Sequence, residues 1–273
     1  MTNETDRHSG RQIALNNELE SLYWLHRFGG LLSRQLSTLV WPGCEQGLRM
    51  AQRTLHRLVD QREVMRRPLR NGGNVYVLGE AGARRLTDRG IHASTRGTRD
   101  LSWSKPFHRV LANDIAIGAI IEGHAVWTEL EIQRGVAPFR ELHGHIPDAL
   151  ICQDPENSSD LTWIEVENAA KSQARLSKLL TIANALVSPS DGYQVDKYSI
   201  TEFAFVIPNP QTLRALVRAY ARYIQKHDVS ANARIRISIW EVNLSPSLAW
   251  GGIKSQYSAI GYLPATESPL PTG

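Results

Sequence analysis

The sequence predicts an α+β fold in two parts, and three observations support this prediction. Apolar residues recur at helical spacing up to about residue 94, where a hairpin pattern also occurs. Between residues 104 and 243, runs that alternate as β-strands do are interleaved with amphipathic helical runs. The 273 residues, 42% of them hydrophobic and 21% charged, are also enough to bury a sizeable core.

Composition excludes several classes of protein. The apolar content is too high for a disordered chain, and no apolar run approaches the roughly 20 residues that cross a bilayer. The polar start lacks the apolar stretch of a secretory signal, so we expect a cytoplasmic protein with no membrane partner. Cys44 and Cys152 are too far apart in sequence for a zinc knuckle or a disulfide framework, and we expect both to be small buried residues.

Positive charge is concentrated in the first part of the chain. Residues 1–99 carry 16 arginines, no lysine and 9 acidic residues, a net charge of +7, whereas the remainder has a net charge of −3. Arginine forms bidentate contacts with phosphates and guanine edges. The pattern favours a nucleic-acid-binding module joined to a part that concentrates carboxylates.

Three short helices are predicted at the start of the chain. The first covers residues 15–27, the second covers 34–40 after the N-cap Ser33, and the third covers about 45–61. On the third helix, an apolar stripe is opposed by polar side chains, with the arginines spaced by four. We expect these polar residues to contact DNA: Gln46, Arg49, Arg53 and Arg57.

A hairpin and a further helix follow. Residues 63–78 contain two β-prone runs around the turn signal Asn-Gly-Gly-Asn at 71–74, and a helical piece covers 80–88. This order predicts a winged helix-turn-helix domain over residues 11–94, with the third helix in the major groove and the hairpin along the backbone. The hairpin candidates for DNA contact are Arg66, Arg67 and Arg70. The alternative is a winged helix that binds another protein while its arginines remain solvated.

The second predicted domain covers residues 104–243. A linker at residues 95–105 precedes it, and an extended, loosely held tail at 244–273 follows it. The expected elements are a helix at 107–122, strands at 126–132, 146–152 and 161–167, a helix at 171–187, a strand at 201–207, a helix at 211–225 and an edge strand at 234–240.

Acidic side chains gather on the first three strands of this domain. Glu129 and Glu131 share one face of the first strand, Asp148 follows a proline at the start of the second, and Glu165 and Glu167 share one face of the third. Each of them alone would be read as solvent-facing. Together they would repel one another unless a cation lay between them, and a hard divalent cation with oxygen ligands fits that role.

The element order, with Pro147-Asp148 and then Glu165-x-Glu167, resembles the PD-(D/E)xK nuclease superfamily. With the N-terminal winged helix, residues 11–241 resemble the replication-relaxation proteins of plasmids and integrative elements, a group that includes MOBC-type mobilisation relaxases. The resemblance implies a restriction-endonuclease-like α/β domain with an αβββαβ core. It also implies a DNA endonuclease or relaxase that hydrolyses phosphodiesters with Mg²⁺ or Mn²⁺.

The resemblance assigns roles to particular residues. Asp148 and Glu165 would be the central metal ligands and Glu129 the additional acidic ligand, with Glu131 as its competitor. The catalytic candidates of the whole site are Asp148, Glu165, Glu167, Lys171 and Glu129.

The lysine of the motif is missing from its expected position. Glu167 stands there, and Lys171 is the candidate substitute, while Glu167 is alternatively a further metal ligand. The histidines His143 and His145 precede the Pro-Asp step, and we expect them to be solvated loop residues.

The departure at 167 favours a second hypothesis, a non-catalytic DNA-binding transcription or replication regulator with a degenerate nuclease fold. A third is a subunit that cuts only within a larger assembly. DNA is the expected partner, and conjugation or transposition proteins and a second copy of the chain are further partners that the sequence leaves open.

Overall fold

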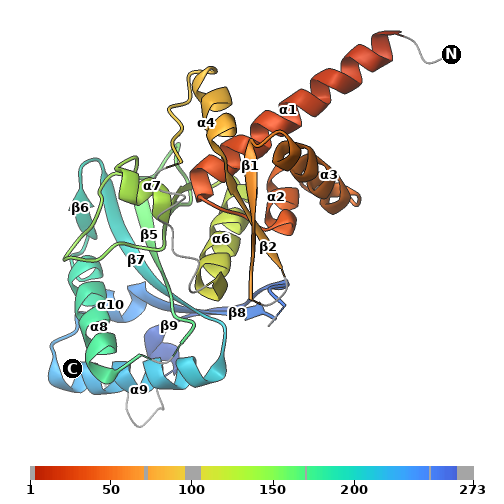
Figure 1. The fold of residues 1–273 in the computed structure, drawn as a ribbon. Helices are drawn as coiled ribbons and strands as arrows, with labels where there is room; N and C mark the ends of the chain where they lie inside the picture. The colour runs from red at the N-terminus through yellow and green to blue at the C-terminus, as the bar shows by residue number, and fades with distance from the viewer. Residues whose placement is uncertain (1–3, 71–72, 96–105, 170, 246, 263–273) are drawn as a thin grey trace. The chain divides into compact units, whose positions relative to one another are not determined.

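The computed structural model describes residues 4–70, 73–95, 106–169, 171–245 and 247–262. The fold is α+β, as predicted, and the chain divides into two compact units, Met1–Ile121 and Glu122–Gly273 (Figure 1). Among the described helices, none combines the length and apolar character that a bilayer span requires. Cys152 is buried as expected, but Cys44 is exposed, because it lies in the turn before the third helix.

The first unit has the predicted order of three helices, a hairpin and a fourth helix. Apolar side chains at helical spacing, such as Leu22, Leu36, Leu55 and Leu58, are fully buried and form its core. The predicted turn residues at 71–72 lie outside the described part of the chain. The elements are α1 (Glu4–Phe28), α2 (Ser33–Val40), α3 (Gly47–Asp60), β1 (Val64–Pro68), β2 (Asn74–Leu78), α4 (Glu80–Thr87) and α6 (Pro106–Ile121).

Helix α6 belongs by its contacts to the first unit, whereas the sequence analysis put residues 107–122 at the start of the second domain. Arg34 of α2 donates from both Nη atoms to the two carboxylate oxygens of Asp114, each at 2.7 Å, and Gln35 Nε2 donates to Asp114 at 2.8 Å. Asn113 donates to the carbonyl of Gly30 at 3.0 Å. These polar contacts join α6 to α2 and to Gly30 before it. The linker predicted at residues 95–105, between the two domains, lies outside the described residues except at Thr95.

The second unit is built on a mixed sheet with the strand order β3-β4-β5-β7-β8-β9, and β6 pairs with β7. The pairs β5–β7 and β7–β8 are parallel, and the other pairs are antiparallel. The elements are β3 (Ala125–Thr128), α7 (Glu129–Arg134), β4 (Ala149–Cys152), β5 (Asp160–Val166), α8 (Gln173–Val187), β6 (Tyr193–Val195), β7 (Tyr198–Ile207), α9 (Pro210–Lys226), α10 (Ala231–Arg236), β8 (Ile237–Leu244), β9 (Trp250–Ser258) and η1 (Ala259–Tyr262).

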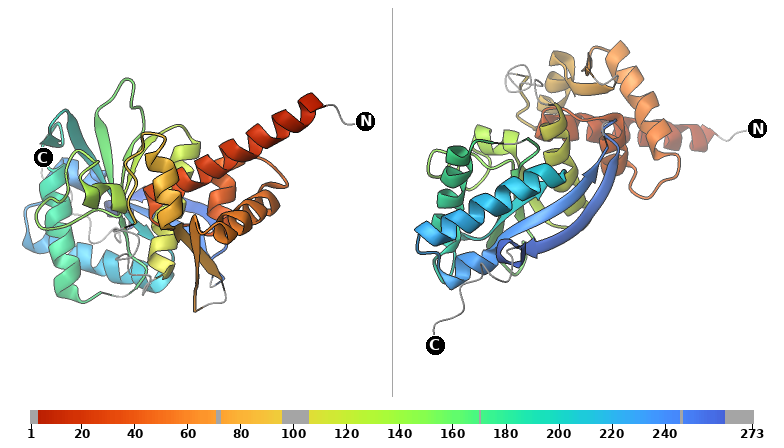
Figure 2. Two further views of the ribbon diagram at one scale, coloured as in Figure 1. Left: turned by 45° about the horizontal axis from the view of Figure 1, so that its top comes forward. Right: turned by 90° about the horizontal axis from the view of Figure 1, so that it is seen from below.

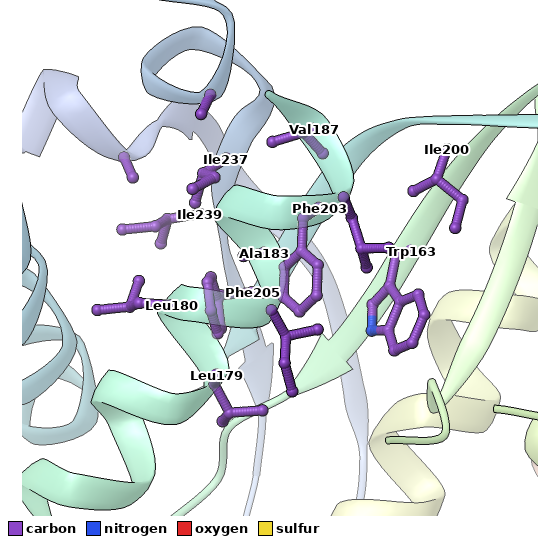
Figure 3. Packing of buried hydrophobic residues seen from close by; sticks show 14 of the residues in the cluster. Trp163, Leu179, Leu180, Ala183, Val187, Ile200, Phe203, Phe205, Ile237 and Ile239 are labelled. Atoms are coloured by element: carbon purple, nitrogen blue, oxygen red, sulfur yellow. The ribbon is translucent and has the colours of Figure 1, made fainter. Parts of the chain in front are cut away.

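The core of this unit lies between the sheet and its helices. Trp163 of β5 stacks on Phe203 of β7 at a centroid distance of 5.6 Å, and Leu180 and Ala183 of α8 belong to the same buried cluster (Figure 3). Helix α9 adds Tyr220, which is also fully buried. The core therefore anchors β5, the strand that also carries the central acidic residues.

The predicted strand at residues 126–132 was wrong in its second half. Strand β3 ends at Thr128, and α7 begins at Glu129. Thr128 Oγ1 accepts a hydrogen bond from the amide of Glu131, and the Glu131 carboxylate accepts one from the amide of Thr128. This reciprocal capping box stops the strand and starts a helix, so Glu129 and Glu131 do not share a strand face.

The end of the chain also differs from the prediction. Residues 231–236 form α10, capped by Ser230, and β8 begins only at Ile237. Strand β8 is not an edge strand, because β9 pairs with it where we expected a loosely held tail (Figure 2). The Gly, Ser and Pro residues of this segment suggested a tail, but pairing with β8 satisfies its backbone. Residues 263–273 lie outside the described part of the chain.

Candidate functional site

Asp148 is hydrogen-bonded to strand β5 on both sides of Glu165. Its amide donates to the carbonyl of Ile164 at 3.0 Å, and its Oδ2 accepts from the amide of Val166 at 2.7 Å. Asp148 immediately precedes β4, which pairs antiparallel with β5, so the register of the two strands brings it there. The structure therefore brings the Pro-Asp step and the first acidic residue of the Glu165-x-Glu167 run to the same place.

Glu165 is a buried carboxylate with two basic neighbours. Its side chain is only 5% exposed, and its Oε2 lies 2.8 Å from Nε2 of His145. Its Oε1 lies 3.5 Å from Nζ of Lys171. A buried carboxylate is costly without such partners, and His145 and Lys171 supply them here.

Glu167 is buried even more completely. Its Oε1 accepts a hydrogen bond from Nζ of Lys171, and its Oε2 is a buried oxygen with no hydrogen-bond partner among the described residues. Burial raises the pKa of Glu167 to about 7, the Lys171 ammonium limits that rise, and the charges of Glu165 and Asp148 add to it. The charge of Asp148 therefore acts on Glu167, whose partner Lys171 also contacts Glu165.

Lys171 lies just before α8. Helix α8 begins at Gln173, where the N-cap Ser172 accepts a hydrogen bond from the amide of Arg175. Because the cap places the helix start directly after Lys171, its side chain can reach back to the end of β5 and contact Glu165 and Glu167.

His145 joins this cluster, which the sequence analysis did not expect. Its side chain is 27% exposed, and the hydrogen bond with Glu165 raises the pKa of His145. The signal in the sequence was its place just before the Pro-Asp step, but no periodicity showed that its ring would face β5. We call Asp148, Glu165, Glu167, Lys171 and His145 the β5 cluster.

The two other acidic candidates are placed differently. Glu129 lies on α7 and accepts a hydrogen bond from Gln133, and Glu131 is engaged in the capping box with Thr128. Within the described part of the chain, no three His, Cys, Asp or Glu side chains are grouped so that they could hold a metal ion. Glu129 therefore does not complete a three-residue group with Asp148 and Glu165.

The donor set of the β5 cluster still suits one type of cation. Mg²⁺ is usually held by one or two carboxylates, with water and substrate phosphates completing an octahedral shell. Asp148 and Glu165 supply two carboxylates beside the end of β5. These oxygens fit Mg²⁺ or Mn²⁺ better than a metal that prefers sulfur ligands.

The arginines of α3 lie on the surface of the first unit. Arg49, Arg53 and Arg57 are exposed and follow one another at four-residue intervals, and Gln46 is exposed at the N-cap. Arg57 differs from the other two, because its Nε lies 3.2 Å from a carboxylate oxygen of Glu18 on α1. Part of its charge is thus balanced within the unit.

The hairpin and α3 enclose a groove. Arg66 is exposed and pairs across the hairpin with Tyr76, whereas Arg67 pairs with Val75 and is half-buried. Arg70 is exposed near the tip. The groove is lined by Gln52, His56 and Val59 of α3 with Arg66 and Tyr76 of the hairpin. Of these five residues only Arg66 was expected from the sequence, because the other four come together only where the hairpin packs against α3.

Comparison with known proteins gave one match. A family model described as replication-relaxation matches residues 22–188, which include α3, the hairpin and the whole β5 cluster. No curated protein and no solved structure matches the chain.

Proposed function

This chain belongs to the replication-relaxation family, and from that premise we propose that it nicks or cleaves DNA of a plasmid or mobile element by metal-dependent phosphodiester hydrolysis. The first unit would act as a winged helix that binds the DNA. The second would act as a PD-(D/E)xK nuclease-like domain that carries the chemistry.

The observation that carries this proposal is the position of Lys171. Its ammonium contacts both Glu165 and Glu167, although it comes from a segment four residues beyond the expected motif position. Asp148 is bonded on either side of Glu165, so Asp148, Glu165 and Lys171 supply the two acidic residues and the lysine that the nuclease motif requires.

Each residue has a distinct role in the proposed chemistry. Asp148 and Glu165 would hold Mg²⁺ or Mn²⁺, which lowers the pKa of a bound water and offsets charge on the phosphate. Lys171 would orient the attacking water and interact with the phosphate. Glu167 would hold Lys171 in place through its buried carboxylate.

The arginines of α3 and the hairpin support the DNA-binding half of the proposal. Arg49 and Arg53 are exposed on one helix, and Arg66 lines the groove between that helix and the hairpin. Guanidinium groups placed in this way can contact phosphates and guanine edges. The recognised DNA would then be delivered to the second unit.

The test is nicking of supercoiled plasmid DNA that carries the origin of the element. Wild-type protein with Mg²⁺ or Mn²⁺ is expected to convert it to the open-circular or linear form, and the variants Asp148→Ala and Lys171→Ala are expected to fail. Lys178→Ala changes an exposed lysine on α8, the helix that follows Lys171, and is the control that should retain activity. Equal activity of wild type and Asp148→Ala, or none with either ion, would refute the enzymatic proposal.

A second candidate function is a non-catalytic DNA-binding regulator. It is favoured by the contacts of Glu165, whose two oxygens already face His145 and Lys171. Calorimetry separates the two candidates: DNA binding without any uptake of Mn²⁺ would favour the regulator.

A further inference from the structure

His145 contacts the carboxylate to which we assign metal binding, yet the proposed chemistry does not use it. Its Nε2 lies 2.8 Å from Oε2 of Glu165, while Lys171 lies 3.5 Å from Oε1. Different groups therefore hold the two oxygens of this carboxylate. The division is important because a carboxylate can bind a cation through one oxygen or through both.

The imidazole is held in place independently of Glu165. Leu142 and His145 exchange both backbone hydrogen bonds, each 3.0 Å long, around a turn in which His143 has a φ of 52° and Gly144 a φ of 68°. These angles are those of a tight two-residue hairpin turn. The ring also stacks on the fully buried Trp163 at 6.1 Å, with an interplanar angle of 14°. Backbone and core together thus direct Nε2 toward Glu165.

We propose that His145 is a positioning residue that restricts Glu165 to binding a cation through Oε1 alone, so that the site selects Mg²⁺ or Mn²⁺ over Ca²⁺. This proposal rests on the function proposed above. Small octahedral cations need only one oxygen from each carboxylate, whereas Ca²⁺ takes six to eight oxygens and often both from one carboxylate. Freeing Oε2 would let Glu165 bind through both oxygens and so favour the larger ion.

A set of substitutions isolates the hydrogen bond. His145→Gln keeps an amide N–H that can reach the position of Nε2, and His145→Asn carries its N–H nearer the position of Nδ1. His145→Ala has no donor. The matched control is His143→Asn, because His143 lies in the same turn but packs on Tyr193 at 5.6 Å, and asparagine tolerates a positive φ.

The experiment is calorimetric titration of the full chain with Mn²⁺ and with Ca²⁺ in the absence of DNA. His145→Ala and His145→Asn are expected to lose Mn²⁺ affinity by about 10- to 100-fold, as is typical when a partner of a metal ligand is removed. Their affinity for Ca²⁺ should fall by less, so the Mn²⁺/Ca²⁺ affinity ratio should decrease. His145→Gln and His143→Asn should keep the wild-type ratio. Thermal unfolding of each variant checks that it is folded.

Three results would overturn the role of His145. The first is an unchanged Mn²⁺/Ca²⁺ affinity ratio in His145→Ala, and the second is a loss of Mn²⁺ affinity in His145→Gln as large as in His145→Ala. The third is a nitrogen hyperfine coupling in the electron paramagnetic resonance of bound Mn²⁺ that disappears in His145→Ala, because His145 would then be a ligand itself. Wild-type protein that binds neither ion would contradict the proposed function as a whole, whereas binding with an unchanged ratio would contradict only the role of His145.

Discussion

Lys171 donates a hydrogen bond to the buried carboxylate of Glu167, four residues earlier in the chain. Glu167 is 1% exposed, so its negative charge depends on this one cation. The pairing also brings the Lys171 ammonium to Glu165. Lys171, which lies outside the usual motif position, and Glu167, which occupies that position, therefore form one ion pair.

Because Glu167 and Lys171 form one ion pair, we expect their substitutions to have non-additive effects on the rate of cleavage. Lys171→Ala should reduce single-turnover nicking by about 10²- to 10³-fold, the range for loss of one preorganised electrostatic donor. Glu167→Gln should reduce the rate of nicking by about 10- to 100-fold, because the substitution removes the carboxylate charge that positions Lys171. The double variant should be no worse than Lys171→Ala alone.

The control for this cycle is Lys178→Ala, which changes an exposed lysine on α8. If the two single effects multiply in the double variant, Glu167 acts separately from Lys171 and the positioning role is wrong.

The arginines of α3 should contribute unequally to DNA binding. Arg49→Ala combined with Arg53→Ala is expected to weaken binding and lower the salt slope by about two, since each lost phosphate contact removes about 0.9 from it. Arg57→Ala should have a smaller effect, because Glu18 already balances part of its charge. Fluorescence anisotropy at several salt concentrations measures both quantities.

Arg84→Ala, at an exposed position on α4, provides the matched loss of one positive charge away from α3. A double variant that binds like Arg84→Ala would show that α3 does not face the DNA.

Removing one partner of the buried ion pair between Arg34 and Asp114 should destabilise the first unit. Burial raises the pKa of Asp114, the Arg34 guanidinium limits that rise, and the Asp114 side chain is only 3% exposed. Asp114→Ala leaves the buried part of the Arg34 guanidinium without this carboxylate, whereas Gln35 keeps its hydrogen bond to the carbonyl of Val110. We expect a loss of about 3–5 kcal/mol in the free energy of unfolding.

Urea denaturation measures this loss. The control is Asp60→Ala, which removes the surface pair with His56 and should change the free energy of unfolding by less than about 0.5 kcal/mol. Similar losses in the two variants would mean that removing Asp114 costs no more free energy of unfolding than removing the exposed Asp60.

The burial of Tyr220 predicts that the free energy of unfolding decreases at alkaline pH. Burial raises the pKa of Tyr220 from 10.0 to about 12, and its hydroxyl has no hydrogen-bond partner among the described residues. The neutral phenol is thus favoured in the folded state, so its contribution is fully present below pH 10 and is lost as the pH rises through about 12. The loss should reach about 2.7 kcal/mol, because each unit of pKa difference corresponds to about 1.36 kcal/mol.

Tyr220→Phe removes the ionisable group. Its free energy of unfolding should be about 1 kcal/mol higher than that of wild type at pH 8, because no buried hydroxyl is left without a hydrogen bond. Its advantage should grow between pH 10 and 12 in urea denaturation. A constant difference between the two proteins over that range would contradict the raised pKa.

Local patterns predicted much of the fold. The arginine spacing on α3, the hairpin and the alternation of β5 depend on neighbours in sequence, so periodicity was sufficient to find them. The capping box between Thr128 and Glu131 is also local, and its Thr-x-x-Glu pattern could have shown that β3 ends before Glu129. Strand β9 could not be found in this way, because its pairing with β8 makes it a strand.

The sequence by itself determined the residue types of this protein: an arginine-rich N-terminal part, a Pro-Asp step, a Glu-x-Glu run at the end of a strand and a lysine displaced from its usual place. Only the tertiary structure decided which of them meet. His145 faces Glu165 and Lys171 faces Glu167 because a tight turn, a strand register and a helix cap bring them together. Side-chain spacing along one element cannot encode distances between separate elements, which arise only when the core packs.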